Sequence, residues 1–122
     1  MYTMDDNCTV YQTVDYISKK WTLLILLEIY KGIQGKRRYS EIKNSLPNIT
    51  PKVLSARLKE LESRGLITKH IDTSIFPVKC EYNLTKAGLD FISIIKDIKG
   101  WALRWKIKNE LCQQLDCKEC KL

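Results

Sequence analysis

Apolar residues follow helical spacing over most of this chain. Val10, Val14 and Ile17 recur at i, i+4 and i+7, which predicts a first helix that Thr9 caps. The next segment, Trp21–Tyr30, is apolar on nearly every side. It therefore predicts a second helix that lies buried at the centre of the fold.

Two further helices follow, with a tight turn between them. Ser40 can cap a helix over Glu41–Leu46, and Pro47-Asn48 is a strong turn signal. Thr50-Pro51 opens a fourth helix with proline at its first position, and Gly65 ends it. The inner face of this helix carries Leu54, Leu58 and Leu61. The order predicts a helix-turn-helix.

A hairpin and a long helix complete the pattern, which is the outline of a winged helix. Leu66–Ile71 and Lys79–Leu84 are short β-prone runs, Arg37–Tyr39 is a shorter extended segment, and Thr85 caps a helix over Lys86–Lys108. One stripe repeats in 4-3-4-3 spacing: Phe91, Ile95, Ile98, Ala102 and Trp105, with Cys112 one heptad further. The stripe fits the core of its own domain or, as its length and tryptophans favour, a seam between two chains.

The net charge of the chain lies on the helix-turn-helix. Ten Lys/Arg and three Asp/Glu fall between Lys31 and Lys69, a net of +7, whereas the other positions hold eleven of each sign. A polyanion would therefore bind at this part of the molecule.

The outward face of the fourth helix is short, polar and cationic. It carries Lys52, Ser55, Ala56, Lys59 and Ser63, with Arg57 to one side. Such a face suits a recognition helix in the major groove. Taken alone, it also describes the solvated face of an ordinary amphipathic helix, which is the commoner case.

Four blocks of sequence stand in a specific order: Cys8, KKWTLLILLEI at 19–29, RRYSEIKNSLPNITPKVLSARLKELESRGLI at 37–67 and PVKCEYNLTKAG at 77–88. Together they resemble the HxlR-type winged helix-turn-helix transcriptional regulators of bacteria and archaea. The resemblance implies an α+β fold with a two-stranded wing, and a homodimer built from N- and C-terminal helices that binds operator DNA. Residues 1–108 would form this winged domain and 109–122 a cysteine-rich tail.

The expected DNA contacts follow from the helix placement and the resemblance, which puts Thr50, Pro51 and Lys52 at the start of the recognition helix. The candidate residues are Lys36, Arg37, Arg38, Lys43, Thr50, Pro51, Lys52, Ser55, Ala56, Arg57, Lys59, Lys69 and Lys79. The cations and the helix N-terminus would hold phosphates, while Lys52, Ser55 and Lys59 would read bases. Ala56 would touch a thymine methyl. Two recognition helices about 34 Å apart would require a double-stranded operator with an inverted repeat.

Two positions depart from the family pattern. The wing tip at 73–76 holds no Lys or Arg, which weakens the expectation of a cation in the minor groove. Cys80 stands where the family usually carries valine, and we expect it to pack as a small hydrophobic residue.

The other cysteines leave three alternatives open. Cys8 lies near the position of a cysteine that senses electrophiles or oxidants in some relatives. The tail adds Cys112, Cys117 and Cys120 in a C-x4-C-x2-C pattern. These four could be inert thiols, could form disulfides in response to oxidants, or could bind zinc. A single C-x2-C pair is moderate support at best, so no metal site or other cofactor is predicted.

The sequence offers no enzyme chemistry. It has no glycine-rich phosphate loop, no spaced carboxylate pair and no nucleophile with an evident base, and its one histidine, His70, falls on a wing strand. The acidic start MYTMDDNC lacks the signal-peptide pattern, and Trp21–Leu27 is too short to cross a bilayer. We therefore expect a cytoplasmic protein with no membrane partner, and the sequence identifies no small-molecule effector. The rival interpretation is a winged-helix module that docks proteins on its basic face, without sequence-specific DNA binding.

Overall fold

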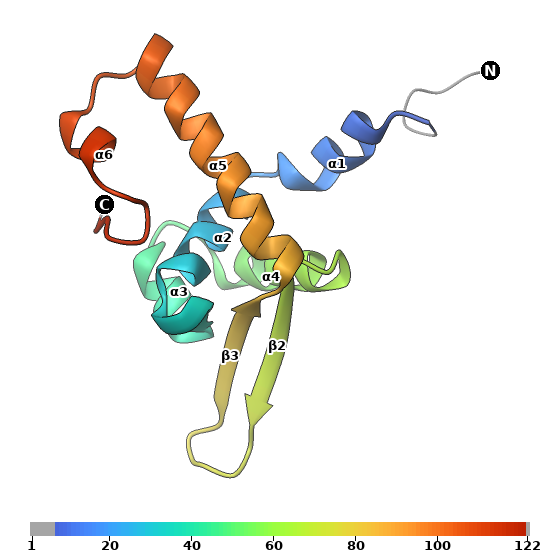
Figure 1. Cartoon of the computed structure of the whole chain (residues 1–122). Helices are drawn as coiled ribbons and strands as arrows, with labels where there is room; N and C mark the ends of the chain where they lie inside the picture. The colour runs from blue at the N-terminus through green and yellow to red at the C-terminus, as the bar shows by residue number, and fades with distance from the viewer. Residues whose placement is uncertain (1–6, 122) are drawn as a thin grey trace.

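The computed structural model, which describes residues 7–121, consists of helices packed on one another with a small antiparallel sheet at one side (Figure 1). Most of the acidic start, on which the signal-peptide expectation rests, lies outside this range. In chain order the elements are α1 (Thr9–Ile17), α2 (Thr22–Lys31), the 3-10 turn η2 (Ile33–Gly35), β1 (Lys36–Arg38), α3 (Tyr39–Ser45), α4 (Pro51–Ser63), β2 (Ile67–Asp72), β3 (Lys79–Leu84), α5 (Lys86–Trp105) and α6 (Glu110–Gln114).

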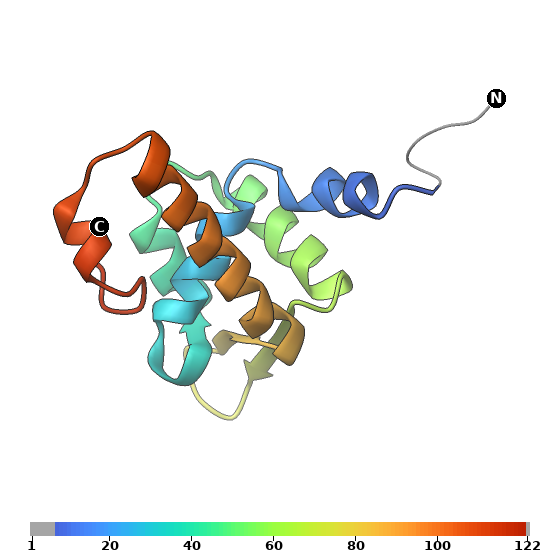
Figure 2. The ribbon, with the colours of Figure 1, turned by 45° about the horizontal axis from the view of Figure 1, so that its top comes forward.

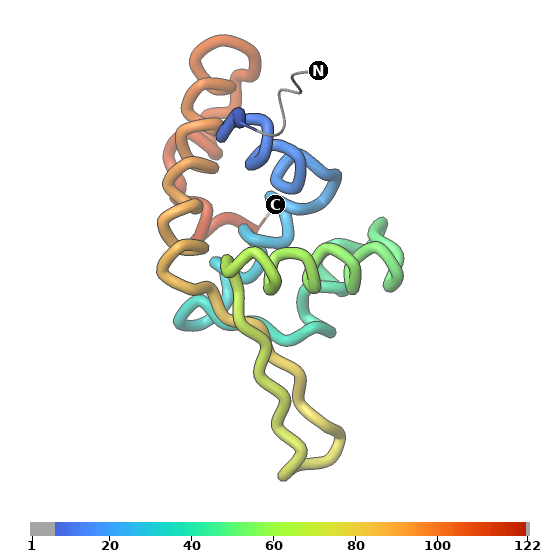
Figure 3. The backbone as a smooth tube through the Cα atoms, turned by 90° about the vertical axis from the view of Figure 1, so that its right-hand side faces the viewer, coloured from blue at the N-terminus to red at the C-terminus, as the bar shows by residue number. Residues whose placement is uncertain are grey.

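The sheet has the strand order β1-β3-β2 with antiparallel pairing throughout. β2 and β3 pair from Ile67↔Leu84 to Asp72↔Lys79, which confirms the predicted two-stranded wing. The wing projects away from the helices (Figures 1 and 3). The extended segment expected at Arg37–Tyr39 begins one residue earlier and pairs with β3 as a third strand.

The central helix α2 forms the middle of the hydrophobic core, as predicted. Its residues Ile25, Leu26 and Ile29 are fully buried. They belong to one apolar cluster with the leucines of α4 and with Ile92 and Ile95 of α5. Burying each such side chain contributes about 1.5–3 kcal/mol, so this cluster supplies most of the stability of the fold.

Both ends of α4 have the predicted caps. Thr50 Oγ1 accepts the N–H of Val53 at 3.2 Å, with Pro51 at the first helical position. At the other end Gly65 adopts a φ of +80°, and the N–H groups of Gly65 and Leu66 donate to carbonyls of the last turn. This Schellman arrangement turns the chain from α4 into β2.

Two other predicted caps are wrong. Cys8, not Thr9, caps α1, because its Sγ accepts the N–H of Tyr11 at 3.3 Å. α3 starts at Tyr39, so Ser40 lies inside it, and Arg38 is the cap residue. There the Glu41 carboxylate accepts the Arg38 backbone N–H at 3.0 Å, a reach-back contact that replaces a capping hydroxyl.

Thr85 caps α5, as predicted, and also ties it to the end of α4. Its Oγ1 accepts the N–H of Gly88 at 3.1 Å and donates to the carbonyl of Gly65 at 2.6 Å. The approach is so close that a Cβ on Gly88 would lie 2.1 Å from the Leu66 carbonyl oxygen. Glycine is therefore required here for helix α5 to pack on the start of the wing.

α5 ends at Trp105, so its predicted extension to Lys108 is wrong. Cys112 consequently lies on α6 and does not continue the apolar stripe. The stripe itself divides: Ile95 is buried in the core of its own chain, whereas Trp105 is 69% exposed. Its far half, together with the exposed apolar residues of the projecting helix α1 (Figure 2), lacks cover within the described chain.

The C-terminal tail folds back onto α5 and α2. Lys96 Nζ lies 2.5 Å from an Asp116 carboxylate oxygen, and Lys118 Nζ donates to the carbonyls of Tyr30 and Gly32 at 2.6 and 3.0 Å. The hydrogen bond from Lys96 lowers the pKa of Asp116 to about 2, and the same pair raises the pKa of Lys96. The tail is thus held by polar contacts.

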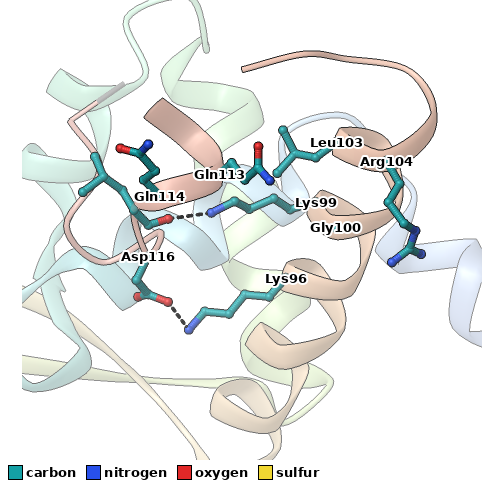
Figure 4. A pocket seen from close by; sticks show the side chains of 9 residues that line it. Lys96, Lys99, Gly100, Leu103, Arg104, Gln113, Gln114 and Asp116 are labelled. Carbon is teal, nitrogen blue, oxygen red and sulfur yellow. Dashed lines mark hydrogen bonds and ion pairs between the residues drawn. The ribbon is translucent and has the colours of Figure 1, made fainter. Parts of the chain in front are cut away.

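A cleft of about 560 Å³ opens between α5 and the tail (Figure 4). Lys99 Nζ donates to the Leu115 carbonyl across it at 2.7 Å. The side chain of Arg104 points away from the tail.

Candidate nucleic-acid interface

The outward face of α4 is free of contacts with the core. Lys52, Ser55, Ala56 and Lys59 are all exposed, while Leu54, Leu58 and Leu61 on the opposite face are 0–1% exposed. The helical spacing of the leucines therefore predicts both faces correctly. A helix with one buried leucine face presents its other face in a fixed orientation.

One edge of α4 is held by α1 and by the connection between α1 and α2. Arg57 Nε donates to the Lys20 carbonyl at 3.2 Å, and Glu60 pairs with Lys19 at 3.0 Å. The guanidinium of Arg64 stacks over the Tyr16 ring at 4.5 Å. These contacts fix how α4 is rotated, and they give Arg57 a partner that the sequence did not indicate.

The N-terminal end of α4 lies close to the start of α3. The hydroxyls of Tyr39 and Ser55 are 3.5 Å apart, so Tyr39 borders the predicted base-reading face. Tyr39 is not among the contact residues that the sequence predicts. Its position just before Ser40, at the start of the predicted third helix, was the available signal.

The three cations of β1 divide by strand alternation. Lys36 and Arg38 are exposed, whereas Arg37 points inward. Arg37 Nη1 donates to the Glu28 carboxylate at 2.6 Å and to the Glu28 carbonyl at 3.2 Å. The Glu28 side chain is only 9% exposed, so Arg37 neutralises a largely buried charge.

The base of the wing adjoins β1. Lys36, Arg38 and Lys79 line one cleft of about 460 Å³, whose acidic residues are Glu41 and Glu81. Lys79 pairs with Glu81 at 3.4 Å, which offsets part of its charge.

The other predicted cations lie on both sides of this region. Lys69 is exposed on β2 in register with Tyr82, and Lys43 is half-buried on α3. Burial raises the pKa of the Tyr82 phenol on β3. The structure thus brings the cations of β1 and β3 together, with α4 presented beside α3.

All five cysteines are half-buried thiols. Cys80 packs against the hydrophobic core, as expected for its position on β3. Cys117 and Cys120 lie in the turn that follows α6. Within residues 7–121, no group of three or more His, Cys, Asp or Glu side chains is arranged to hold a metal ion. In the same range no helix is long and apolar enough to span a bilayer.

Comparison with known proteins decides the family. The model of the HxlR-like helix-turn-helix family matches residues 16–110. The chain belongs to this family.

Relatives and solved structures agree with this membership. The HTH-type transcriptional regulator YvaP of Bacillus subtilis (strain 168) is 39% identical over 94 residues, covering 77% of this chain and 83% of YvaP. A structure from Porphyromonas gingivalis W83, described as a MarR-family transcriptional regulator, has a TM-score of 0.73 and 32% identity over 86% of this chain and 99% of its own. The oxidized form of the redox regulator HypR has a TM-score of 0.66 and 33% identity, over 82% and 99% of the two chains.

This HxlR-like protein is therefore a transcriptional regulator of the helix-turn-helix type, and the predicted α+β winged fold is confirmed. Its family is one of DNA-binding regulators, and its relatives are named as regulators rather than as enzymes.

Proposed function

We propose that two copies of this chain bind an operator with an inverted repeat, each placing α4 in the major groove. The observation that carries this proposal is the exposed face of α4, which combines two lysines with the small residues Ser55 and Ala56. Small residues at the centre of the face allow the helix to approach the base edges.

Phosphate contacts would surround this face. Thr50 and the N-terminus of α4 can hold one phosphate through backbone N–H groups and the helix dipole. Lys36, Arg38 and Lys43 would contact the backbone on one side, and Lys69 and Lys79 would do so from the wing. Arg57 would contact the DNA backbone from the edge of α4. Arg37 instead supports β1 through its ion pair with Glu28.

The dimer would form through α1 and the far half of α5. Val10 of α1 is 69% exposed and Trp101 and Trp105 of α5 are 51% and 69% exposed. A chain of this size seldom leaves large side chains uncovered along two helices unless another surface packs there. A second copy would bury both sets symmetrically.

We also propose that the regulator responds to oxidants through Cys8 and the tail cysteines. The solved structure of HypR, named as a redox regulator, is similar in fold and sequence. Cys8 is half-buried at the start of α1, and Cys112, Cys117 and Cys120 lie in the tail beyond α5. α1 and α5 also carry the proposed dimer surface, so a disulfide there would alter how the two α4 helices are spaced.

Fluorescence anisotropy tests the proposal. The purified protein is titrated against a duplex from the region upstream of its own gene and against a scrambled duplex, first reduced and then after diamide treatment. Tight, selective binding that changes on oxidation would support both parts. Binding that is weak, salt-labile and blind to sequence would instead favour the rival module that docks proteins on its basic face.

A further inference from the structure

The tip of the wing is apolar and exposed. The loop between β2 and β3 carries Ile75, Phe76 and Val78, which are 47%, 96% and 54% exposed. Phe76 thus presents nearly its whole ring to solvent. Single exposed aliphatic residues are common on protein surfaces, but three together at the end of a hairpin indicate a contact surface.

The loop that carries Phe76 contains hydrogen bonds between its own residues. The Asp72 carboxylate accepts hydrogen bonds from the Ser74 N–H at 2.9 Å and the Ser74 hydroxyl at 2.5 Å. These hydrogen bonds lower the pKa of Asp72, because they stabilise its carboxylate within the turn. The strands below remain paired out to Asp72 and Lys79. Phe76 therefore lies at the end of a two-stranded arm that is paired up to the loop.

The surroundings of the tip match those of the proposed DNA surface. Pro77 and Val78 line a cleft of about 360 Å³ together with Arg38 and Lys79. Lys69 is exposed on the other strand of the wing. Cations that would hold phosphates therefore lie beside the foot of the tip loop, and a polyanion fits this border better than an apolar partner.

We propose that Phe76 is an apolar wedge that enters the minor groove of the operator, partly unstacks one base step and bends the duplex. The inference rests on the proposed DNA binding. With α4 in the major groove, the wing would face the adjacent minor groove. The tip of this wing has no cation that the negative potential of the minor groove could attract. Insertion of an apolar side chain is the other established way to engage that groove.

The wedge would add specificity at positions that α4 does not touch. Pyrimidine–purine steps are the most easily kinked, so the preferred operator should carry such a step outside each half-site. Replacing that step by a stiffer one should weaken wild-type binding.

The test uses the full-length protein and a duplex enriched from a random library by binding to the wild-type chain. Affinity is measured by anisotropy, bending by energy transfer between labelled ends, and unstacking by 2-aminopurine placed at the flanking steps. We expect Phe76→Ala to weaken binding by about tenfold, with less bending and no 2-aminopurine signal. Phe76→Trp should retain all three properties, and Thr73→Ala, in the same exposed loop, should change none.

The outcomes separate this inference from the function on which it rests. If Phe76→Ala binds and bends the duplex as the wild type does, the wedge is excluded and DNA binding stands. Weaker binding with unchanged bending and stacking would also exclude it, since Phe76 would then contact only the backbone. Loss of self-association in light scattering, with DNA binding intact, would assign the tip to a protein contact. Failure to enrich any duplex would remove both proposals.

Discussion

The guanidinium of Arg37, on β1, lies 2.6 Å from the carboxylate of Glu28, on the central helix α2. Lys31 approaches the other carboxylate oxygen at 3.4 Å. The ion pair between Arg37 and Glu28 therefore holds β1 in place, and the other two cations of this strand, Lys36 and Arg38, face outward. The same contact explains why a polar residue interrupts the most apolar helix of the chain.

Removing Arg37 should lower stability. Arg37→Ala leaves the Glu28 carboxylate largely buried with a weaker partner, and we expect a loss of about 2 kcal/mol, reduced from the fully buried case because Arg37 is partly exposed. Urea unfolding would show this as a lower midpoint at unchanged slope.

Arg38→Ala is the matched control for that measurement. Its side chain is exposed on the same strand, so its effect should stay within about 0.5 kcal/mol. Adding Glu28→Gln to Arg37→Ala should restore part of the loss. Equal effects of the two arginine variants would contradict the assignment of the ion pair.

Removing a cation from α4 should weaken DNA binding. Lys52→Ala is expected to lower affinity about tenfold and to reduce the salt dependence by about one phosphate contact. Arg57→Ala should also weaken binding, although it also removes the bond to the Lys20 carbonyl. Lys108→Ala, beyond α5, provides an exposed-lysine control. Wild-type affinity in both α4 variants would disprove the placement of the recognition helix.

A charge in the proposed dimer surface should separate the subunits. Trp105→Asp places a carboxylate where two apolar surfaces would meet, and light scattering should then report the 14.3 kDa monomer. Ile33→Asp, at a position that is 86% exposed on η2, should leave the assembly unchanged. A wild-type chain that is already monomeric at micromolar concentration would refute the dimer.

Docking of the tail should weaken in acid. The pKa of Asp116 is lowered to about 2 in the folded chain, against about 4 for a free side chain. Its carboxylate therefore favours the docked tail fully above pH 4, and this contribution disappears as the pH falls through 2. Asp116→Asn should reproduce the release at pH 7, detected as faster amide exchange over residues 115–121. Glu119→Gln, in the same turn, is the control, and slow exchange in both variants would contradict the role of Asp116.

Cys8→Ser should abolish the response to oxidants. Diamide takes two electrons from a pair of thiols to form a disulfide, so the wild type should change its DNA affinity on treatment while the variant does not. Cys80→Ala, at a thiol packed against the core, should respond as the wild type does. An unchanged response in Cys8→Ser would exclude Cys8 as the sensor.

The parts of the fold that the sequence predicted correctly depend on local chemistry. Helix α4 starts at Thr50 and Pro51 and ends at Gly65, and its leucines at helical spacing form its inner face. Both features are readable from the sequence because caps and periodicity act within a few residues. The wrong caps fell where two neighbouring groups could serve. At α1 the thiol of Cys8 caps the helix in place of the expected hydroxyl of Thr9. At α3 the carboxylate of Glu41 accepts the Arg38 N–H, in place of a cap by the Ser40 hydroxyl.

The sequence by itself therefore determined the order of the elements, the faces of α4 and the concentration of positive charge around it. Lys31 and Lys79 have partners three and two positions away, but tertiary structure alone decided which cations have distant partners inside the chain. Arg37 meets Glu28 across 9 positions, Arg57 meets Lys20 across 37, and Lys118 meets Tyr30 across 88. No local pattern encodes such pairs, because they form only when packing of the core brings distant segments together and offsets the entropy of closing the loops between them.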